Sequence, residues 1–488
     1  MQDFPQYRLD KLQLLDELGI SAWAERFETT HTLAEAQELP DDTANVRVAG
    51  RIIAIRKIGK LTFAHLQDLQ GRIQFSLRQN EVGELYDRFH RTVDIGDFVG
   101  VVGTTYTTRT GEKTVRSEGY VFLGKALREL PEKWHGLTDI ELRYRQRYLD
   151  LITSEDSRRV FLLRSKLLRS IRNFLDSRGF IEVETPILTN QPSGALAAPF
   201  VTHHNALDID TYLRIAPETY LKRCVVGGFT HVYEVARNFR NEGISPTHLQ
   251  DFTMIEGYSA YWNYEDNMRL MRELILYLLD ELFGTRTITI GEQEINFDQP
   301  WPVVTFRDLI LQDAGIDIDA HEDARSLLQA IRNKNIVLEH ENLEALGKGN
   351  LVDQLYKKVS RPQIIRPTFL TAHPVELSPL ARRNDANPNI TDRFQLIVNG
   401  AEIVNAYSEL VDPIEQRRRL EEQAALRRQG DAEAMPMDHD YLRAMEYGMP
   451  PISGWGMGID RLLQVLLDLP NIRDGVLFPL MRPLHEQD

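Results

Sequence analysis

Hydrophobic and polar positions alternate with two different periods along the chain, and the change of period divides it. Over residues 8–40 the apolar side chains recur at helical spacing, which predicts one helical stretch through Trp23 and Phe27 and a second that ends near Leu39. From residue 46 to about 123 the pattern becomes five short alternating runs separated by glycine, and such runs are typical of strands. We therefore predict a few helices followed by a small closed β-barrel.

The rest of the chain mixes helical and strand periods. An amphipathic helix is predicted at 160–179, and the strand-like segment 181–188 follows it directly. Helical patterns recur at 265–285 and through a less regular stretch of about 305–370, and the last long helix is predicted to begin near Ile459. This organisation predicts three parts: residues 1–140 with the helices and the barrel, a linker at 141–155, and a larger domain at 156–488.

Length and composition are typical of a soluble protein. The 488 residues are 42% apolar and 26% charged, which is enough chain for about three average domains or for two of unequal size. No run approaches the ~20 apolar residues of a membrane span, and the first residues lack the basic and apolar parts of a secretion signal. Cys224 is the single cysteine, which excludes an internal disulfide and a cysteine zinc site. We expect a cytoplasmic protein with no membrane partner.

Charge is distributed unevenly along the chain. The formal net charge is −15, which argues against a protein that coats nucleic acid over its whole surface. Residues 46–80 nevertheless contain seven basic side chains and one acidic side chain, Asp68, for a local charge of +6. This basic segment falls within the predicted barrel and indicates a polyanionic partner there.

Two glycine patterns are similar to nucleotide-binding loops without matching them. Residues 119–125 have the spacing of a Walker loop, but Ala126 stands where a hydroxyl residue must reach magnesium. Gly454, Gly456 and Gly458 form G-x-G-x-G, and no strand-forming run precedes them as the dinucleotide fingerprint requires. Neither pattern supports a nucleotide loop.

Several charged residues lie in apolar, strand-like contexts, where an ionised side chain needs a partner. The segment VYEVARNFRNEGISPTHLQDFTMIEGY alternates like two strands joined by a polar loop, which predicts a hairpin with Arg240 near its tip, opposite Glu256 on the returning strand. A surface hairpin with cross-strand ion pairs is the simplest interpretation. A polar pocket accounts for more, because five charged residues share this context: Glu218, Arg240, Glu256, Glu402 and Glu409.

The same segments resemble the signature motifs of class II aminoacyl-tRNA synthetases. FRNEG with the downstream FTMIEGY is similar to motif two, GWGMGIDRL at 454–462 to motif three, and the helix and strand that end at Pro186 to motif one, which forms the dimer. Within that class the chain resembles the bacterial lysyl-tRNA synthetases in LRIAPETYLKRCVVGGF, VNGAEIVNAYSEL, EYGMPPISGWGMGIDR and LFPLMRP, in that order. RIIAIRKIGKLTFAHLQDLQGRIQ is similar to the anticodon-binding barrel of that family, so the resemblance covers nearly the whole chain.

The resemblance implies an α+β fold, in which an N-terminal OB-fold barrel precedes a catalytic domain built on an antiparallel sheet flanked by helices. It implies an ATP-dependent, AMP-forming ligase that activates L-lysine as lysyl-adenylate and transfers it to the 3′-terminal adenosine of tRNA(Lys). The lysine carboxylate is already ionised at pH 7, so positioning and charge stabilisation suffice for catalysis. The expected state is a homodimer, and the expected cofactor is Mg²⁺ bound with ATP.

The resemblance also assigns the nucleotide end of the site. Arg240 is expected to bridge the lysine carboxylate and the α-phosphate, and Arg461, at the start of the last helix, to bind the γ-phosphate. His248 is expected near the triphosphate and Phe252 against the adenine. Glu242 completes the ATP-binding set that the family pattern implies.

Metal binding is implied at the residues that match family carboxylates. Glu402 matches the main ligand, Glu409 is a further candidate, and Gln395 stands where a second acid is expected. An amide oxygen can coordinate magnesium but adds no charge. Three other positions depart from the family pattern: Ala198 in place of an arginine, Leu249 in place of an asparagine, and Gly257 in place of a larger apolar residue.

Recognition of lysine requires anions at the far end of its side chain. Glu218 and Glu409 match the family pair that faces the ε-ammonium group. The other lysine-binding positions implied are Gly194 and Glu256 for the α-amino group, Asn405 for the carboxylate, Tyr258 beside the ammonium and Tyr407 along the aliphatic stem.

In the predicted barrel, the resemblance assigns the anticodon contacts. Phe63 is expected to stack on a base, while Arg56 and Gln74 read uridine edges. The alternative for Phe63 is a place in the barrel core, which its apolar side chain would suit equally well.

Three other functions remain to be weighed. An aspartyl- or asparaginyl-type synthetase of the same subclass has the same architecture, but its pocket needs cations where this chain has Glu218 and Glu409. A lysine ligase that modifies a protein would lack the N-terminal barrel. A non-catalytic RNA-binding paralogue is expected to have lost Arg240 or Arg461, and both are present.

Overall fold

The computed structural model describes residues 4–131, 139–339, 342–428 and 435–483. The chain forms two compact units, Met1–Arg158 and Arg159–Asp488. The first unit includes the expected linker, residues 141–155, which forms two short helices joined by an ion pair between Arg143 and Asp150 at 3.0 Å. These helices are α5 (Ile140–Arg145) and α6 (Arg147–Thr153).

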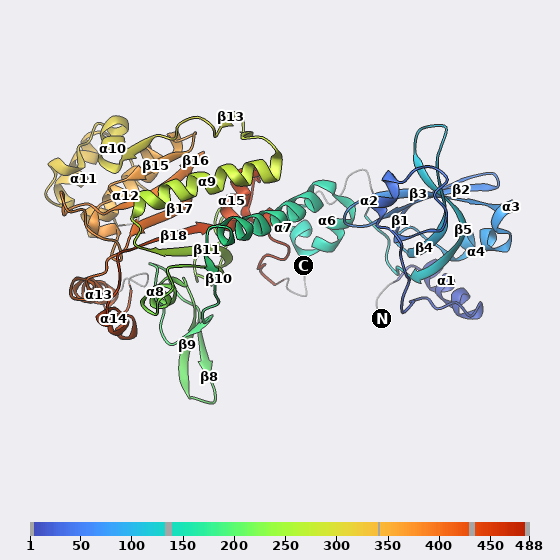
Figure 1. The fold of residues 1–488 in the computed structure, drawn as a ribbon, viewed down its shortest axis with the longest axis horizontal. Helices are drawn as coiled ribbons and strands as arrows, with labels where there is room; N and C mark the ends of the chain where they lie inside the picture. The colour runs from blue at the N-terminus through green and yellow to red at the C-terminus, as the bar shows by residue number, and fades with distance from the viewer. Residues whose placement is uncertain (1–3, 132–138, 340–341, 429–434, 484–488) are drawn as a thin grey trace. The chain divides into compact units, whose positions relative to one another are not determined.

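The predicted β-barrel is confirmed. Five strands of the first unit close in the order β1-β2-β3-β5-β4 (Figure 1). Alternate side chains of each strand point inward, so that Val48, Ala64 and Phe75 share one apolar core. The elements of this unit are α1 (Gln6–Glu17), α2 (Leu33–Glu38), β1 (Val46–Ile58), β2 (Leu61–Gln67), β3 (Arg72–Arg78), α3 (Gln79–Val82), α4 (Glu84–Thr92), β4 (Phe98–Thr107) and β5 (Lys113–Gly124).

The prediction that the first helical stretch continues through Trp23 and Phe27 is wrong. Helix α1 ends at Glu17, and Gly19 follows with φ +64°, a conformation that ends a helix. Phe27 instead packs on the barrel, because a Cβ added at Gly100 would lie 2.6 Å from its ring. The apolar spacing after α1 therefore does not indicate a helix.

The second unit is built on one eight-stranded sheet. Its order is β14-β15-β16-β17-β18-β11-β10-β6, and the expected antiparallel arrangement holds for the six central strands. The two edge strands, β14 and β6, pair in parallel. The strands are β6 (Ile181–Glu182), β10 (His231–Phe239), β11 (Asp251–Ala260), β14 (Val303–Thr305), β15 (Thr368–Thr371), β16 (Arg393–Val398), β17 (Ala401–Ser408) and β18 (Ile452–Gly458).

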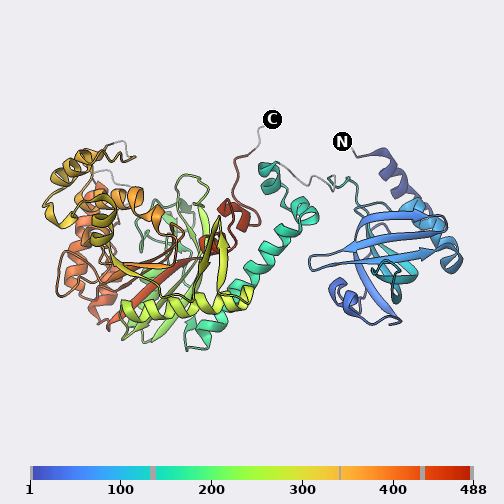
Figure 2. The ribbon, with the colours of Figure 1, turned by 90° about the horizontal axis from the view of Figure 1, so that it is seen from above.

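Helices cover one face of this sheet. Leu167 of α7, Leu274 of α9 and Leu462 of α15 belong to one core with the inward side chains of the strands. Figure 2 shows α9 running along that face. The helices outside the stretch 305–370 are α7 (Glu155–Asp176), α8 (Glu218–Val226), α9 (Tyr264–Phe283), α13 (Pro413–Arg428), α14 (His439–Glu446) and α15 (Ile459–Leu466).

Two predicted elements of this unit are shorter than expected. The segment 181–188 is not one strand: β6 ends at Glu182 and β7 (Leu188–Thr189) begins beyond Pro186, a residue that cannot donate to a sheet ladder. Helix α15 begins at Ile459 as predicted but has eight residues. Two small sheets complete the strands, formed by β7, β8 (Val201–His204) and β9 (Ile209–Leu213) and by β12 (Thr287–Ile290) and β13 (Gln293–Asn296).

The stretch 305–370 contains the expected helices, and their apolar side chains form one core cluster together with Leu370 and Ile397 of the sheet. Its main helices are α10 (Phe306–Ala314), α11 (Ala324–Asn333) and α12 (Lys348–Val359). Throughout the described part of the chain, no helix is both long and apolar enough to cross a membrane.

Candidate active site

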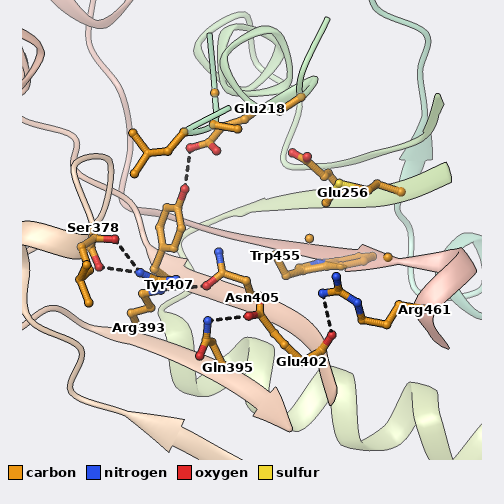
Figure 3. A pocket seen from close by; sticks show the side chains of 18 of the residues that line it. Glu218, Glu256, Ser378, Arg393, Gln395, Glu402, Asn405, Tyr407, Trp455 and Arg461 are labelled. Atoms are coloured by element: carbon orange, nitrogen blue, oxygen red, sulfur yellow. Dashed lines mark hydrogen bonds between the residues drawn. The ribbon is translucent and has the colours of Figure 1, made fainter. Parts of the chain in front are cut away.

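A cavity of about 530 Å³ lies on the sheet face opposite α9 (Figure 3). Its walls come from β11, β16, β17 and β18, from α8, from the β10–β11 loop and from α12. It brings together all the site residues predicted in the second unit: Gly194, Glu218, Arg240, Glu242, His248, Phe252, Glu256, Tyr258, Gln395, Glu402, Asn405, Tyr407, Glu409 and Arg461.

Glycines of β18 form the floor of the cavity. Gly454 and Gly456 alternate with Trp455 and Met457, whose side chains are buried in the core on the other face. A Cβ added at Gly454 would collide with Glu409 and with the ring of Tyr258. The G-x-G-x-G pattern therefore lies in a strand, and the missing side chain at Gly454 leaves room for Glu409 and Tyr258 beside the cavity.

At one end of the cavity, two carboxylates share a lysine of the protein itself. Lys222 Nζ donates to Glu218 Oε1 at 2.6 Å and forms an ion pair with Glu409. Tyr407 Oη also donates to Glu218 Oε1, at 2.7 Å. Burial disfavours the ammonium, but the nearby carboxylates outweigh it and hold the pKa of Lys222 well above its ordinary value. Lys222 is therefore a fixed cation between the two acids.

Glu256 faces the same end of the cavity from β11. Tyr258 Oη donates to Glu256 Oε2 at 3.1 Å. Burial, and then the negative charge of Glu218, raise the pKa of Glu256 to about 8. The carboxyl therefore holds a proton at pH 7 in the free cavity, and a cation placed beside it would favour release of that proton.

The opposite end of the cavity is cationic. Arg240 lies beyond the end of β10, with its guanidinium carbon 5.1 Å from the centre of the Phe252 ring. Arg461, in the first turn of α15, donates to the backbone carbonyl of Glu402 at 3.3 Å. Burial and the positive charge of Arg461 lower the pKa of His248, which is therefore neutral at pH 7. Two fixed guanidinium groups and a neutral imidazole suit a polyphosphate.

The predicted metal ligands separate into two places. Gln395 Nε2 donates to Glu402 Oε2 at 2.9 Å, so these two side chains meet. Glu409 lies just beyond the end of β17, seven residues after Glu402, and pairs with Lys222 in this structure. Among the described residues, no three His, Cys, Asp or Glu side chains form a metal-binding group.

The register of the predicted hairpin differs from expectation. Strands β10 and β11 form it, but Glu256 lies opposite Glu234 rather than Arg240. Arg240 is paired with Gln250, whose carbonyl accepts from the Arg240 backbone nitrogen at 2.9 Å. The alternation of the sequence locates both strands but not the length of the loop between them.

The predicted anticodon residues lie on neighbouring strands of the barrel. Phe63 on β2 alternates with the buried positions of that strand, so it faces outward and not into the core. The exposed Arg56 lies directly opposite it on β1. Gln74 on β3 is buried, and its amide donates to Glu112 Oε2 at 2.7 Å. Phe63 and Arg56 are thus accessible, whereas Gln74 is engaged within the protein.

The structure adds residues in the cavity wall and directly behind it that the sequence analysis did not single out. Lys222 follows Glu218 by one helical turn on α8, a spacing that is visible in the sequence. Arg393 precedes Gln395 by two positions on β16, which places both on one face of the strand. The stretch 305–370 contributes Asn350, Asp353, Tyr356, Lys357 and Arg361, for which the sequence gives no signal.

Comparison with known proteins adds independent findings. The model of the family described as tRNA synthetases class II (D, K and N) matches residues 139–482, and that of the OB-fold nucleic acid binding domain matches residues 46–122. The lysine–tRNA ligase of Pelotomaculum thermopropionicum is 49% identical over 486 residues, which cover 99% of this chain and 96% of that protein. The enzyme of the same name from Carboxydothermus hydrogenoformans is 47% identical over 99% of both chains. That of Thermosipho africanus is 44% identical over 99% of this chain and 97% of its own length.

Proposed function

We infer that this chain, which belongs to the family of class II tRNA synthetases for aspartate, lysine and asparagine, is a lysine–tRNA ligase. The observation that carries the choice of lysine is the acidic end of the cavity, where Glu218, Glu256 and Glu409 converge. An aspartate or asparagine side chain would require cations or neutral donors there, and the cation that lies between these acids, Lys222, is already bound by two of them.

The first step joins lysine to ATP. The lysine carboxylate attacks the α-phosphorus, a bond forms between them, and pyrophosphate leaves. We assign to Arg240 the task of holding the carboxylate against the α-phosphate, because a guanidinium can bind two anions at once. We assign Arg461 to the γ-phosphate, His248 and Glu242 to the ATP-binding wall, and Phe252 to the adenine.

Lysine lies with its ammonium toward the acids. Its ε-ammonium is placed beside Glu218, Glu409 and Tyr258, and Tyr407 lies along the stem. The α-amino group is placed against Glu256 and the backbone of Gly194, and Asn405 binds the carboxylate. Gly194 suits a close approach of the ligand, because it has φ +89° and a Cβ there would lie 2.9 Å from the Cβ of Glu218.

Magnesium fits between Glu402 and Gln395, where a carboxylate and an amide meet at the cavity. Bound there, it would neutralise charge on the phosphates, which with water would supply most of its oxygen ligands. Gln395 must turn its amide to present oxygen, since its nitrogen now faces Glu402.

The second step transfers lysine to tRNA(Lys). The hydroxyl of the 3′-terminal adenosine attacks the carbonyl of lysyl-adenylate, an ester forms, and AMP leaves. We assign anticodon binding to the outer face of the barrel at Phe63 and Arg56. Gln74 is assigned there too, with the requirement that it release Glu112 to reach a base.

We also propose that the protein is a homodimer and works in the cytoplasm, where its substrates are found. Large apolar side chains remain exposed around β6 to β9, the segment that resembles motif one and its neighbours. They are Ile181, Ile187, Leu188, Val201, Leu207 and Ile209, which are 40% to 63% exposed.

ATP–pyrophosphate exchange measured with each of the twenty amino acids tests the proposed activity. Exchange that depends on lysine alone is expected. Exchange with aspartate or asparagine in place of lysine would overturn the assignment, and the absence of any exchange would favour a non-catalytic paralogue.

A further inference from the structure

Arg393 on β16 is a cavity-lining guanidinium that, among the described residues, is held by neutral acceptors alone. Its Nη1 donates to the carbonyl of Leu377 at 2.8 Å and to Ser378 Oγ at 2.9 Å. Its Nε donates to Asn405 Oδ1 at 2.8 Å (Figure 3). The carboxylates of Glu402, Asp353 and Glu218 attract it at longer range, and none of the hydrogen bonds described for it goes to a carboxylate. A half-buried guanidinium that spends its hydrogen bonds on neutral groups beside a ligand cavity calls for an explanation.

The bond to Asn405 determines which end of the asparagine amide faces the cavity. A guanidinium can only donate hydrogen bonds, so the Asn405 atom beside Nε has to be the oxygen. The –NH₂ group is therefore directed away from Arg393, and Figure 3 shows it pointing into the open cavity. Without Arg393, the amide could turn and present its oxygen instead, because its two ends are nearly equal in size.

The loop that binds Nη1 of Arg393, at Leu377 and Ser378, is itself held by the protein. Arg419 of α13 donates to the carbonyl of Ser378 at 3.2 Å and to the carbonyl of Ala381 at 2.8 Å. The loop that accepts from Arg393 Nη1 is thus itself held in place. Arg393 is consequently suited to orient a neighbour rather than to move onto a ligand.

We propose that Arg393 is a positioning residue that makes Asn405 a hydrogen-bond donor to the carboxylate of bound lysine. This rests on the proposed function, in which Asn405 binds that carboxylate. An amide nitrogen attracts the carboxylate, whereas an amide oxygen in the same place would repel it. Arg393 therefore affects how lysine binds, without touching lysine or ATP.

A double-mutant cycle on the lysine KM of ATP–pyrophosphate exchange tests this role. Arg393→Lys keeps the positive charge but lacks the Nε donor, and it is expected to raise the lysine KM about tenfold, the loss of one charge-assisted hydrogen bond. The ATP KM should stay within about twofold of its original value. In an Asn405→Ala background the same substitution should change the lysine KM less than about twofold, because the amide that it orients is gone.

The matched control is Arg382→Lys on the same loop, where the exposed arginine pairs with Asp385 and no change in either KM is expected. Equal increases of the lysine KM in both backgrounds would overturn the proposal, since a general structural effect does not depend on Asn405.

Asn405→Asp gives an independent measurement in which Arg393 is untouched. The lysine KM should rise at least as far as in Asn405→Ala, and an unchanged lysine KM would also overturn the proposal. Exchange by the unmodified protein is measured first, because its absence contradicts the proposed function and not the role of Arg393.

Discussion

Gly257 on β11 lies directly opposite Trp455 on β18, and a Cβ added at Gly257 would come within 2.5 Å of Trp455 Cζ2. Trp455 is buried in the core of the sheet, and its indole ring fills the space that a side chain at position 257 would need. A larger residue at position 257 would therefore have to displace the indole.

Gly257→Ala is expected to lower the free energy of unfolding by about 1–3 kcal/mol, because the added methyl group overpacks the core against the indole. In a Trp455→Leu background, where the ring is gone, the same substitution should cost distinctly less. Denaturant unfolding of the single and double variants measures both costs. Strict additivity would show that the two residues do not compete for the same space.

The stability of the folded protein should depend on Glu256 between about pH 4.5 and pH 8. Its pKa is raised from 4.5 to about 8, so over this interval the folded state holds a proton that the unfolded state has lost. The free energy of unfolding therefore falls as pH rises, by at most about 1.4 kcal/mol per pH unit from this group, and levels off above pH 8. Urea unfolding of the original protein and of Glu256→Gln at several pH values measures the difference. Parallel pH profiles would show that Glu256 is already ionised in the free cavity.

The positions of strands and helices could be predicted from the sequence where one face of the element is buried and the other is exposed. The barrel strands alternate in just this way, and the amphipathic pattern of α7 locates a helix. The helix predicted through Trp23 and Phe27 was wrong because both lie in extended chain, where Phe27 packs on the barrel and Trp23 is 60% exposed. Pro186 divided a run that is apolar enough for a single strand, since a proline cannot donate to the ladder.

The site was predictable where its residues belong to recognisable motifs. Arg240 and Arg461 follow from the motif resemblance, and the structure brings them to one end of a cavity. Lys222 was missed because a lysine on a helix normally faces water, and its second partner, Glu409, lies far along the chain. The residues that α12 contributes to the cavity wall were missed as well. Helical periodicity predicts which face of a helix is buried, but it does not predict which of the other side chains face a cavity.

Gln395→Glu is expected to lower the magnesium concentration that half-saturates lysine-dependent exchange. The substitution replaces the hydrogen bond from Gln395 to Glu402 with two adjacent carboxylates, which repel each other until a divalent cation joins them. The variant should therefore also have a lower melting temperature than the original protein without magnesium, and regain stability when magnesium is added. Identical magnesium titrations in both measurements would place the ion elsewhere.

Phe63→Ala should separate the two steps of the reaction. The side chain faces outward on the barrel, so its loss removes base stacking worth roughly 1–3 kcal/mol without opening the core. Aminoacylation of tRNA(Lys) should fall, while lysine-dependent pyrophosphate exchange stays near its original rate. Phe75→Ala is the matched control, because Phe75 lies in the barrel core and its loss should lower the stability of the barrel. Equal loss in the two assays for Phe63→Ala would assign it a structural role.

Glu409→Gln is expected to raise the lysine KM about 10- to 150-fold, the equivalent of one charge-assisted hydrogen bond of roughly 1.5–3 kcal/mol, while the ATP KM stays close to its original value. Two effects combine here: the substrate ammonium loses an anion, and Lys222, left with Glu218 alone, competes for the remaining carboxylate. The double variant Glu409→Gln with Lys222→Met separates them, because it removes the competing cation together with its partner. If Glu409 meets the substrate, the lysine KM of the double variant should remain high although the melting temperature recovers in part. A lysine KM restored to its original value in the double variant would mean that Glu409 serves only to neutralise Lys222, and would leave Glu218 as the anion that the substrate meets.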